Sequence, residues 1–464
     1  MKTPYSDAFV FFGASGNLAY EKIFPALQAL ARRGRLEIPV IGVARSDWTT
    51  DEFRAHARNS IKEHGGVDED AFAKLSARLL YLRGDYKEDS TYEQLREALK
   101  DAKQPLHYLA ITPSMFETVT HGLARSGCGK NARIIVEKPF GRDLATAQEL
   151  NHTLRQYFPE DAILRIDHYL GKEPVENLLY FRFANSFLEP IWRHDHVANI
   201  QITMAEKFGL RGRGAFYEEV GAIRDVVQNH MLQVLTLLTM ETPADAGMVA
   251  MNHEKLMVLN AMRPLAASDV ARGQFRGYRG EVGVSPDSHV ETFAALRLFI
   301  DNPRWEGVPF YIRAGKALPV TCTEVTIQLK RPTHPIFDAH HSGQANYLRF
   351  RLSPDVFITL GARTKLPGEG MHGTATQLIA CHSSQENMMP YERLIGDALR
   401  GDNSLFTHGD MVEAAWRVVD PVLSDTALQE YQAGTWGPPS AAQVLTNSDQ
   451  WHDPVLEDGP CETD

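Results

Sequence analysis

Several charged and hydrogen-bonding side chains follow an apolar run in the segment RIDHYLGKEP, residues 165–174. His168, Tyr169 and Lys172 suit a phosphate group, because they supply an imidazole, a hydroxyl and an ammonium near the expected start of a helix. If the strand continues through this segment, Asp167 and Tyr169 share one face and His168 points to the other. A carboxylate repels a phosphate, so we expect Asp167 to have a different task.

A histidine on a predicted helix can supply a base for such a site. His230 lies in a long helix predicted over residues 221–240, three residues after Val227 and four before Val234, which places it on the apolar stripe. A lone histidine there is most simply a buried, neutral core residue. If the Asp167 carboxylate points into the same cleft, it raises the basicity of an imidazole with an ordinary pKa of about 6.5, and His230 becomes a general base.

Further polar residues that could belong to the site lie in other predicted strands and helices. Asp225, earlier in the same helix, and Glu206, at the end of the segment ITMAE, can accept hydrogen bonds from sugar hydroxyls. Glu137 and Lys138 end the run IIVEKPFG, and Pro139 keeps Lys138 out of helical geometry. Because ligands of open α/β sheets collect at the carboxyl ends of the strands, chemistry is expected at this edge. A purely structural strand cap is the alternative.

The first apolar run leads into GASGNLAYEKIFPAL, a glycine turn that opens a helix. Gly13 and Gly16 allow backbone amides to approach a pyrophosphate, and the helix N-terminus adds partial positive charge. A tight turn without a ligand is the alternative. The next run ends in GVARSDW, with Arg45 where an NAD site commonly carries an acid. A guanidinium there favours the 2'-phosphate of NADP, although Asp47 softens this preference and a solvated arginine is the alternative.

The predicted strands and helices around these residues follow two patterns. In the first third of the chain, strand-length apolar runs alternate with amphipathic stretches, which indicates a parallel sheet with helices on both faces. The predicted strands are 8–13, 39–45, 79–85, 106–112 and 132–139, and the predicted helices are 17–33, 91–101, 114–125 and 143–156. We expect a further run, 162–170, to leave this domain.

From about residue 199 onward, strand-like segments with period-two alternation recur, with few helices between them. These segments are 199–206, 291–300, 324–330, 347–352 and 356–362. Such alternation favours a mostly antiparallel sheet.

Composition restricts the class of partner and the compartment. The 48 basic and 59 acidic side chains leave a net charge of −11, which argues against nucleic acid or an anionic membrane surface as the main partner. No apolar run of about eighteen residues predicts a membrane span, and no export leader is recognised, so a cytoplasmic protein is expected. Cys128, Cys322, Cys381 and Cys461 lack CxxC spacing, so we expect reduced thiols and neither a disulfide framework nor a metal site.

Six segments resemble, in order, the motif set of glucose-6-phosphate dehydrogenases, over about residues 8 to 440: GASGNLA, EKPFG, RIDHYLGKEP, RGAFYEEVGAIRDVVQNHMLQ, GVPFYIRAGKALP and YQAGTWGP. The resemblance implies an α/β Rossmann-type coenzyme domain, residues 1–165, and an α+β substrate-binding and dimerisation domain with a large, mostly antiparallel sheet, residues 166–464. It also implies a homodimer or homotetramer. The implied reaction oxidises β-D-glucose 6-phosphate at C1 to 6-phospho-D-glucono-1,5-lactone with hydride transfer to NADP, the first step of the oxidative pentose phosphate pathway, with NAD as a weaker or dual coenzyme.

The resemblance also implies roles for individual residues. His230 resembles the proton acceptor from the C1 hydroxyl, and Asp167 resembles the carboxylate that stabilises the imidazolium. The implied phosphate site is His168, Tyr169 and Lys172, and the implied sugar contacts are Lys138, Glu206, Asp225 and Lys316. The implied coenzyme contacts are Gly13, Ser15, Gly16, Asn17, Leu18, Arg45, Asp85, Tyr86 and Lys138. The Lys138–Pro139 peptide matches a bond whose isomer positions the coenzyme in this family.

The chain departs from the family pattern at four positions. Asn17, Tyr20 and Glu21 stand where an Asp and two basic residues are common, which removes positive charge beside the coenzyme, and Thr321 stands where a second lysine is often found. Two other functions remain open. A related sugar dehydrogenase, as in the glucose-fructose oxidoreductase group, would have no use for Lys172, and retention of His230 argues against a catalytically silent cofactor-binding homologue.

Overall fold

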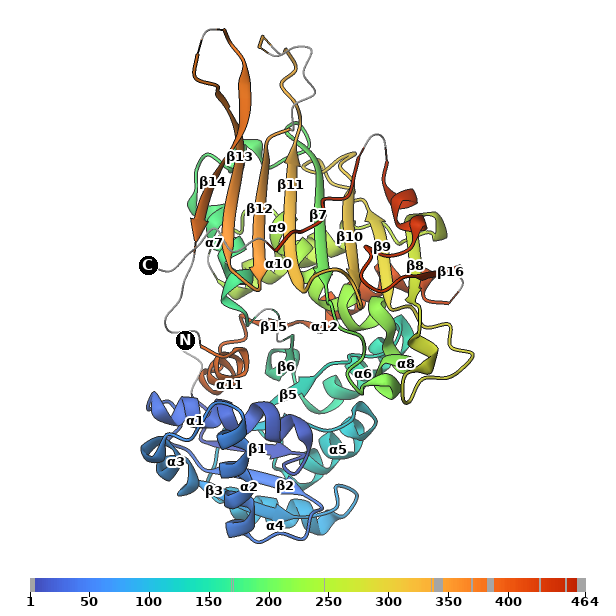
Figure 1. Cartoon of the computed structure of the whole chain (residues 1–464). Coiled ribbons are helices and arrows are strands. Elements are labelled where there is room, and N and C mark those ends of the chain that lie inside the picture. Colours follow the sequence, from blue (N-terminus) through green and yellow to red (C-terminus); the bar gives the residue numbers. More distant parts are fainter. Residues whose placement is uncertain are drawn as a thin grey trace. The chain divides into compact units, whose positions relative to one another are not determined.

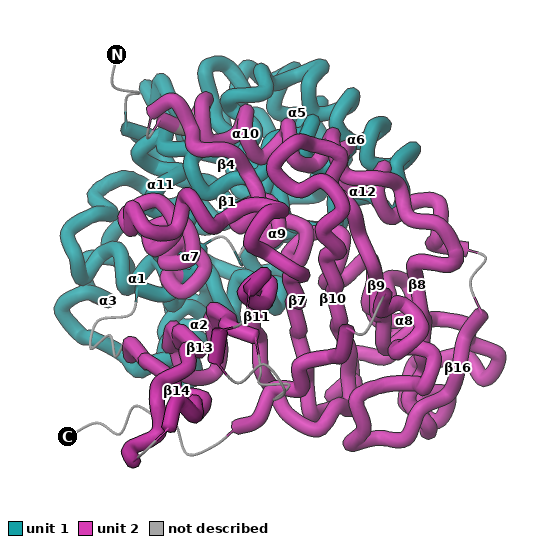
Figure 2. The backbone as a smooth tube through the Cα atoms, turned by 90° about the horizontal axis from the view of Figure 1, so that it is seen from above, with its two compact units in different colours: residues 1–172, 386–413 teal, residues 173–385, 414–464 magenta. Residues whose placement is uncertain are grey.

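The computed structural model describes the chain in two compact units. The described residues are 5–167, 169, 171–245, 247–334, 336–337, 345–368, 370–381, 388–424, 427–446 and 449–456, so the predicted phosphate ligand His168 lies outside them. Unit 1 contains Met1–Lys172 and Glu386–Glu413, and unit 2 contains Glu173–Gln385 and Ala414–Asp464 (Figure 2). The compact units therefore divide seven residues later than the predicted boundary after residue 165, and a distant segment joins unit 1.

Unit 1 is built on a seven-stranded sheet with the order β15-β6-β5-β4-β1-β2-β3 (Figure 1). Strands β1 to β6 are parallel and β15 is antiparallel to β6, which confirms the predicted parallel sheet. The bounds are β1 Ala8–Phe12, β2 Val40–Ala44, β3 Leu79–Arg83, β4 Pro105–Leu109, β5 Arg133–Glu137, β6 Ile163–Ile166 and β15 Phe406–Thr407. The expectation that the run 162–170 leaves this domain is wrong, because β6 pairs with β5 and buries Leu164 and Ile166.

The helices of unit 1 include three that the sequence pattern did not predict, α2, α3 and α11. The bounds are α1 Phe24–Arg32, α2 Thr50–Glu63, α3 Glu69–Ser76, α4 Asp89–Leu99, α5 Phe116–Ser126, α6 Leu144–Tyr157 and α11 Pro390–Arg400, with a π-helical turn η1 at Ala19–Ile23. Leu394 and Ile395 of α11 are fully buried in the same core as Phe9, Phe11 and Leu27. The segment 386–413 thus belongs to unit 1 because it completes an apolar core.

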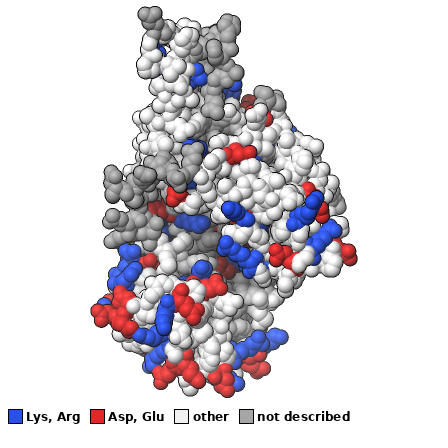
Figure 3. Space-filling view, viewed as in Figure 1, with Lys and Arg blue, Asp and Glu red and all other residues white. Residues whose placement is uncertain are grey.

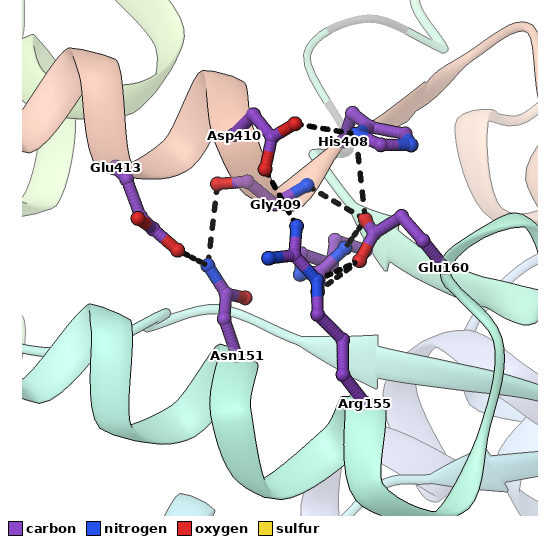
Figure 4. A network of polar contacts seen from close by, with 8 residues as sticks. Asn151, Arg155, Glu160, His408, Gly409, Asp410 and Glu413 are labelled. Atoms are coloured by element: carbon purple, nitrogen blue, oxygen red, sulfur yellow. Dashed lines mark hydrogen bonds and ion pairs between the residues drawn. The ribbon is translucent and has the colours of Figure 1, made fainter.

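A polar network also attaches this segment to unit 1 (Figure 4). The Glu160 carboxylate accepts hydrogen bonds from Arg165 Nη1 at 2.6 Å and from Arg155 Nε at 2.7 Å. The same carboxylate accepts from the Gly409 N–H at 2.8 Å, and Arg155 also binds Asp410 at 2.6 Å. Since Arg165 is fully buried on β6, this network holds the segment 406–413 against the strand that leads into Asp167.

Unit 2 contains a nine-stranded sheet with the order β14-β13-β12-β11-β7-β10-β9-β8-β16 (Figure 1). Only the pairs β7/β10 and β8/β16 are parallel among its neighbours, which confirms the mostly antiparallel sheet. The bounds are β7 Val197–Ala205, β8 Val270–Phe275, β9 Phe293–Leu298, β10 Phe310–Gly315, β11 Cys322–Leu329, β12 Tyr347–Ser353, β13 Phe357–Lys365, β14 Gly373–Cys381 and β16 Leu428–Tyr431.

The two faces of this sheet differ in polarity, as the period-two alternation predicts. On β12, Phe350 is buried against Phe181 of α7, with ring centroids 5.4 Å apart. The next residue, Arg351, is ion-paired with Glu324 at 2.6 Å. On the polar face, Arg313 Nη1 binds Asp453 of the C-terminal segment at 2.8 Å.

The α-helices of unit 2 outnumber the single helix predicted over residues 221–240. They are α7 Glu173–Ala184, α8 Gly214–Ala222, α9 Leu232–Thr239, α10 Met248–Ala261 and α12 Gly409–Val419, of which α12 begins in unit 1. The single helix predicted over 221–240 is interrupted, because Gly221 has a φ of +64° and Ile223–Met231 is the π-helical segment η5. In the described part of the chain, no helix combines the length and apolar character needed to cross a membrane.

The cysteines differ from one another in the structure. Cys128 and Cys322 are free and buried, as expected for reduced thiols. Cys381, the last residue of β14, is disulfide-bonded, so the expectation of reduced thiols is wrong at this position. Sequence spacing carries no sign of this pairing, because a disulfide depends on distance in space.

Candidate active site

The glycine turn after β1 is closed by a tyrosine from the β3–α4 connection. Gly13 has a φ of +85°, and a Cβ there would lie 2.1 Å from the Ala110 carbonyl oxygen, so only glycine fits. The Gly13 N–H donates to the Tyr86 hydroxyl at 2.8 Å, and that hydroxyl donates to the Val43 carbonyl at 3.1 Å. Tyr86, a predicted coenzyme residue, therefore supports the turn itself.

The turn opens a helix whose first residues face solvent. The Gly16 N–H donates to Gly13 O at 2.9 Å and the Tyr20 N–H to Gly16 O at 3.1 Å, which starts the helix. Gly16 and Asn17 are exposed, and Ser15 and Leu18 are partly buried. Because the first turn of a helix has N–H groups without intrahelical acceptors, this geometry fits a pyrophosphate.

A second arginine, Arg83, lies beside Arg45 at the ends of β2 and β3. Arg45 is exposed directly after β2, and Asp47 is ion-paired with Arg83 at 2.7 Å. Arg83 pairs in register with Ala44, next to Arg45. Sequence reasoning missed Arg83, although its place at the end of β3 was a usable signal. Asp85 follows it, partly buried, and its carboxylate accepts from the Lys87 N–H at 3.0 Å.

Two of the departures from the family pattern have structural consequences. The Tyr20 ring packs against His56 and His64, with centroids 4.8 and 5.5 Å away, so it supplies ring contacts to α2 where a charge is common. The Thr321 hydroxyl accepts a hydrogen bond from the Lys207 N–H at 3.0 Å. Both residues therefore have local packing or bonding partners of their own.

Glu137 and Lys138 lie at the carboxyl end of β5, as predicted. Glu137 is buried and accepts hydrogen bonds from the hydroxyls of Tyr108 and Tyr391. Burial raises the pKa of Glu137 to about 7, although both hydroxyls and Lys138 oppose this shift. Lys138 is half-buried, and its peptide bond to Pro139 is cis. Tyr391 comes from α11, and no local pattern in the sequence indicates it.

After β6 the chain turns, so the predicted alternation of Asp167 and Tyr169 along a strand is wrong. Asp167 Oδ1 accepts a hydrogen bond from the Tyr169 N–H at 2.9 Å, and the Lys172 N–H donates to Tyr169 O at 3.1 Å. The Lys172 ammonium lies 4.2 Å from the centroid of the Tyr169 ring. Burial lowers the pKa of Lys172, and Asp167 opposes this effect. Three predicted residues are thus brought together just before α7.

In unit 2, three predicted sugar-contacting residues gather around a buried tyrosine. Lys316 is ion-paired with Glu206, and its ammonium lies 5.0 Å from the centroid of the Tyr217 ring. Burial raises the pKa of Tyr217 well above its ordinary value, and the nearby Asp225 carboxylate adds to the effect. Sequence reasoning missed Tyr217, which lies inside the motif RGAFYEEVGAIRD.

His230 lies on the π-helical segment η5 and is only 3% exposed, in agreement with its predicted place on an apolar stripe. π-Helical segments are rare in proteins, and those that occur often lie at functional sites. The start of η5 is capped by Glu291, two residues before β9, because the Ile223 N–H donates to Glu291 Oε1 at 3.0 Å. Arg272 binds the other oxygen of Glu291 at 2.6 Å. The segment η5, which carries Asp225 and His230, is therefore anchored to the sheet.

The predicted site residues thus divide between the two units. Lys138, Asp167, Tyr169 and Lys172 belong to unit 1 with the glycine turn, whereas Glu206, Asp225, His230 and Lys316 belong to unit 2. The pairing of Asp167 with His230 stays a prediction. On the face seen in Figure 3, acidic and basic side chains are interspersed over unit 1.

Comparison with known proteins matches both parts of the chain. A family model described as "Glucose-6-phosphate dehydrogenase, NAD binding domain" matches residues 10–177, and one described as "Glucose-6-phosphate dehydrogenase, C-terminal domain" matches residues 179–452. The "Glucose-6-phosphate 1-dehydrogenase 1" of Mycobacterium tuberculosis is 41% identical over 458 residues, covering 98% of each chain.

Solved structures agree with these matches. The crystal structure of glucose-6-phosphate 1-dehydrogenase from Mycobacterium avium has a TM-score of 0.92 and 42% identity, covering 98% of this chain and 100% of that one. A glucose-6-phosphate dehydrogenase in complex with its substrate glucose-6-phosphate has a TM-score of 0.89 and 36% identity, covering 97% and 100% of the two chains. The chain belongs to the glucose-6-phosphate dehydrogenase family.

Proposed function

We propose that this chain oxidises β-D-glucose 6-phosphate at C1 to 6-phospho-D-glucono-1,5-lactone and passes the hydride to NADP, as the first step of the oxidative pentose phosphate pathway. The observation that carries this proposal is the similarity over nearly the whole length to glucose-6-phosphate 1-dehydrogenases, which includes both the coenzyme and the C-terminal parts. The residues that this chemistry requires are retained in both units.

The coenzyme is held by unit 1 in this proposal. When bound, NADP supplies the acceptor for the hydride from C1. The turn and helix N-terminus after β1 hold its pyrophosphate, and the cations at the ends of β2 and β3 favour a 2'-phosphate over the free ribose hydroxyl of NAD. The proposed contacts are Gly13, Ser15, Gly16, Asn17, Leu18, Arg45, Asp85, Tyr86 and Lys138, with NAD as a weaker coenzyme.

The sugar is held at both ends. We assign its phosphate to His168, Tyr169 and Lys172, and its hydroxyls to Lys138, Glu206, Asp225 and Lys316. The proximity of Lys172 to Tyr169 and of Lys316 to Glu206 supports these groupings. Binding energy from the dianionic phosphate orients C1 for reaction, although the phosphate itself does not react.

Proton transfer is assigned to His230. As the C1–H bond breaks and the C1–O double bond forms, the hydroxyl proton moves to the imidazole, and Asp167 stabilises the resulting imidazolium. The place of His230 on η5, the segment that also carries Asp225, supports this role.

The organisation of the whole protein follows the same family. We propose that residues 1–165 bind the coenzyme and that residues 166–464 bind the sugar and carry the subunit interface of a homodimer or homotetramer. We also propose that the enzyme works in the cytoplasm.

The first experiment measures reduced-nicotinamide absorbance with glucose 6-phosphate and with glucose, each with NADP and with NAD. We expect turnover with glucose 6-phosphate, faster with NADP. Equal turnover with glucose would indicate a related sugar dehydrogenase, and no turnover in any combination would indicate a silent homologue.

Replacement of one cation tests the phosphate site. Lys172→Ala should raise the KM for glucose 6-phosphate by about tenfold or more, since a charge-assisted contact is lost, and should affect weak turnover of glucose far less. Lys74→Ala, which changes an exposed lysine of α3, is the matched control. An unchanged KM in Lys172→Ala would exclude this residue from the phosphate site.

A further inference from the structure

The motif YQAGTWGP, residues 431–438, has no task in the reaction described above. Tyr431 is the last residue of β16, which pairs in parallel with β8, and it is 4% exposed. Its ring packs against Phe293 with centroids 5.6 Å apart. A Cβ on Gly437 would lie 2.4 Å from the same Phe293 ring, so the motif is packed tightly on β9. Close packing explains the glycine, but it does not explain the tyrosine hydroxyl.

That hydroxyl reaches the turn that carries Lys316. The turn follows β10, and Ala317 has a φ of +52°, in the left-handed region that residues with a Cβ rarely adopt. Such a conformation persists only where surrounding contacts hold it. The direction in which Lys316 points depends on this turn.

Backbone hydrogen bonds fix most of the turn. The Lys316 N–H donates to Thr292 O at 2.9 Å, the Ala317 N–H to Phe208 O at 3.0 Å and the Leu318 N–H to Glu206 O at 3.0 Å. The Ala317 carbonyl accepts from the Gly434 N–H, inside the motif, at 2.7 Å. Since these bonds join backbone atoms, they do not depend on side-chain identity.

The Lys316 carbonyl, in contrast, is held by a side chain. It accepts a hydrogen bond from the Tyr431 hydroxyl at 2.6 Å, and both groups are buried. The same hydroxyl contacts Thr292 Oγ1 at 3.1 Å, which keeps it oriented. Loss of this donor would leave a buried carbonyl without its tyrosine partner, next to a residue in a left-handed conformation.

We infer that Tyr431 is a positioning residue for Lys316: its hydroxyl holds the left-handed turn that aims the Lys316 ammonium between Glu206 and the Tyr217 ring. Tyr431 acts through Lys316 and does not touch the sugar. The inference gives the motif YQAGTWGP a part in substrate binding, and it rests on the sugar-binding role proposed for Lys316.

Tyr431→Phe tests the inference, because it removes the hydroxyl and keeps the ring against Phe293. We expect the KM for glucose 6-phosphate to rise about five- to tenfold, with kcat and the KM for NADP within about twofold of the wild type. Tyr311→Phe is the matched control, since the Tyr311 hydroxyl bonds to Thr446 at 2.8 Å and to Asp449 at 2.7 Å in the C-terminal segment. It should leave all three constants unchanged.

A double-mutant comparison separates positioning from a general structural effect. In a Lys316→Ala background, Tyr431→Phe should raise the KM no further, because the side chain that it positions is gone. An equal rise in both backgrounds, or a wild-type KM in Tyr431→Phe alone, would overturn the inference.

A measurement that does not depend on activity tests the inference even if the wild-type enzyme is inactive. If the wild type does not turn over glucose 6-phosphate, that result contradicts the proposed function. Amide hydrogen exchange of a peptide covering residues 314–320 then tests the turn directly, with faster exchange expected in Tyr431→Phe than in Tyr311→Phe. Equal exchange in the two variants would overturn the positioning role.

Discussion

The pKa values of two glutamates of unit 1, Glu137 and Glu160, are shifted in opposite directions. The neighbours of each carboxylate set the direction of its shift. Burial raises the pKa of Glu137 to about 7. Its hydrogen-bond donors Tyr108 and Tyr391 are neutral, and they offset the effect of burial only in part. Burial also acts to raise the pKa of Glu160, but Arg165 and the other donors of its network outweigh it and lower that pKa to about 2. At neutral pH, Glu160 is an ionised structural group, whereas Glu137 is partly protonated beside Lys138.

The raised pKa of Glu137 predicts a pH-dependent stability. Between its ordinary value of 4.5 and about 7, the folded chain keeps a proton that the unfolded chain has lost, so stability falls as the pH rises through this window. Glu137→Gln removes this effect, and urea unfolding should show its stability relative to wild type improving by up to about 3 kcal/mol from about pH 5 to pH 8. The control is Glu97→Gln at an exposed position of α4. A difference that is independent of pH would contradict the shifted titration.

His230 carries the prediction about the chemistry itself. His230→Asn removes the proton acceptor and should lower kcat by about 10²–10⁴-fold, with little change in the dissociation constant of glucose 6-phosphate from calorimetry. His196→Asn changes an exposed histidine just before β7 and should be near wild type. A fully active His230→Asn enzyme would refute the general-base role.

At the scale of elements, the π-helical segment η5 is the carrier of the proposed base and of Asp225. It begins where Gly221 breaks the preceding helix, and Glu291 both caps its first N–H and binds Arg272. Glu291 is 2% exposed, so its charge is balanced locally in a buried setting. The position of His230 therefore depends on an ion pair between Arg272 of β8 and Glu291, which precedes β9.

Removal of one partner from this buried pair should be costly. Glu291→Ala is expected to lower the free energy of unfolding by about 3–5 kcal/mol and to reduce kcat, because Arg272 loses its counter-ion and η5 loses its cap. Asp301→Ala breaks the exposed pair Arg263–Asp301 and should cost at most about 1 kcal/mol. Urea unfolding measures both changes. Equal losses in the two variants would show that Glu291 has no special structural role.

At the scale of the whole molecule, unit 1 is discontinuous in sequence. Its core joins Leu27 and Leu30 of α1 with Leu394 and Ile395 of α11, and β15 extends its sheet beside β6. The first 172 residues thus leave an apolar surface uncovered when α11 is absent.

A fragment experiment tests this dependence. Residues 1–172 alone should lack a cooperative thermal transition and should bind a hydrophobic dye, whereas the same residues joined to 386–413 by a flexible linker should melt cooperatively. The linked fragment with Leu394→Asp is the control and should behave like the short one. A cooperative transition in residues 1–172 alone would contradict this account of the core.

Much of the architecture follows from signals that act over a few residues. The apolar runs of β1 to β5, the glycine turn at Gly13 and the period-two alternation of β7, β11 and β12 are local, so the parallel sheet and the mostly antiparallel sheet were both predictable. Strands β8, β10 and β14, helices α2 and α3, and the short strand β15 were not predicted, because their pattern is weak or their pairing partner is distant.

The two kinds of sheet, the glycine turn and the residues suited to the chemistry can be read from the chain alone, since motif order and periodicity are properties of its local sequence. The side chains that support them became visible only in the folded chain: Tyr391 bonds to Glu137, Glu291 caps η5, and Tyr431 bonds to Lys316, 115 positions away. Hydrogen bonds between such distant residues depend on how the chain is folded, and no local pattern encodes them.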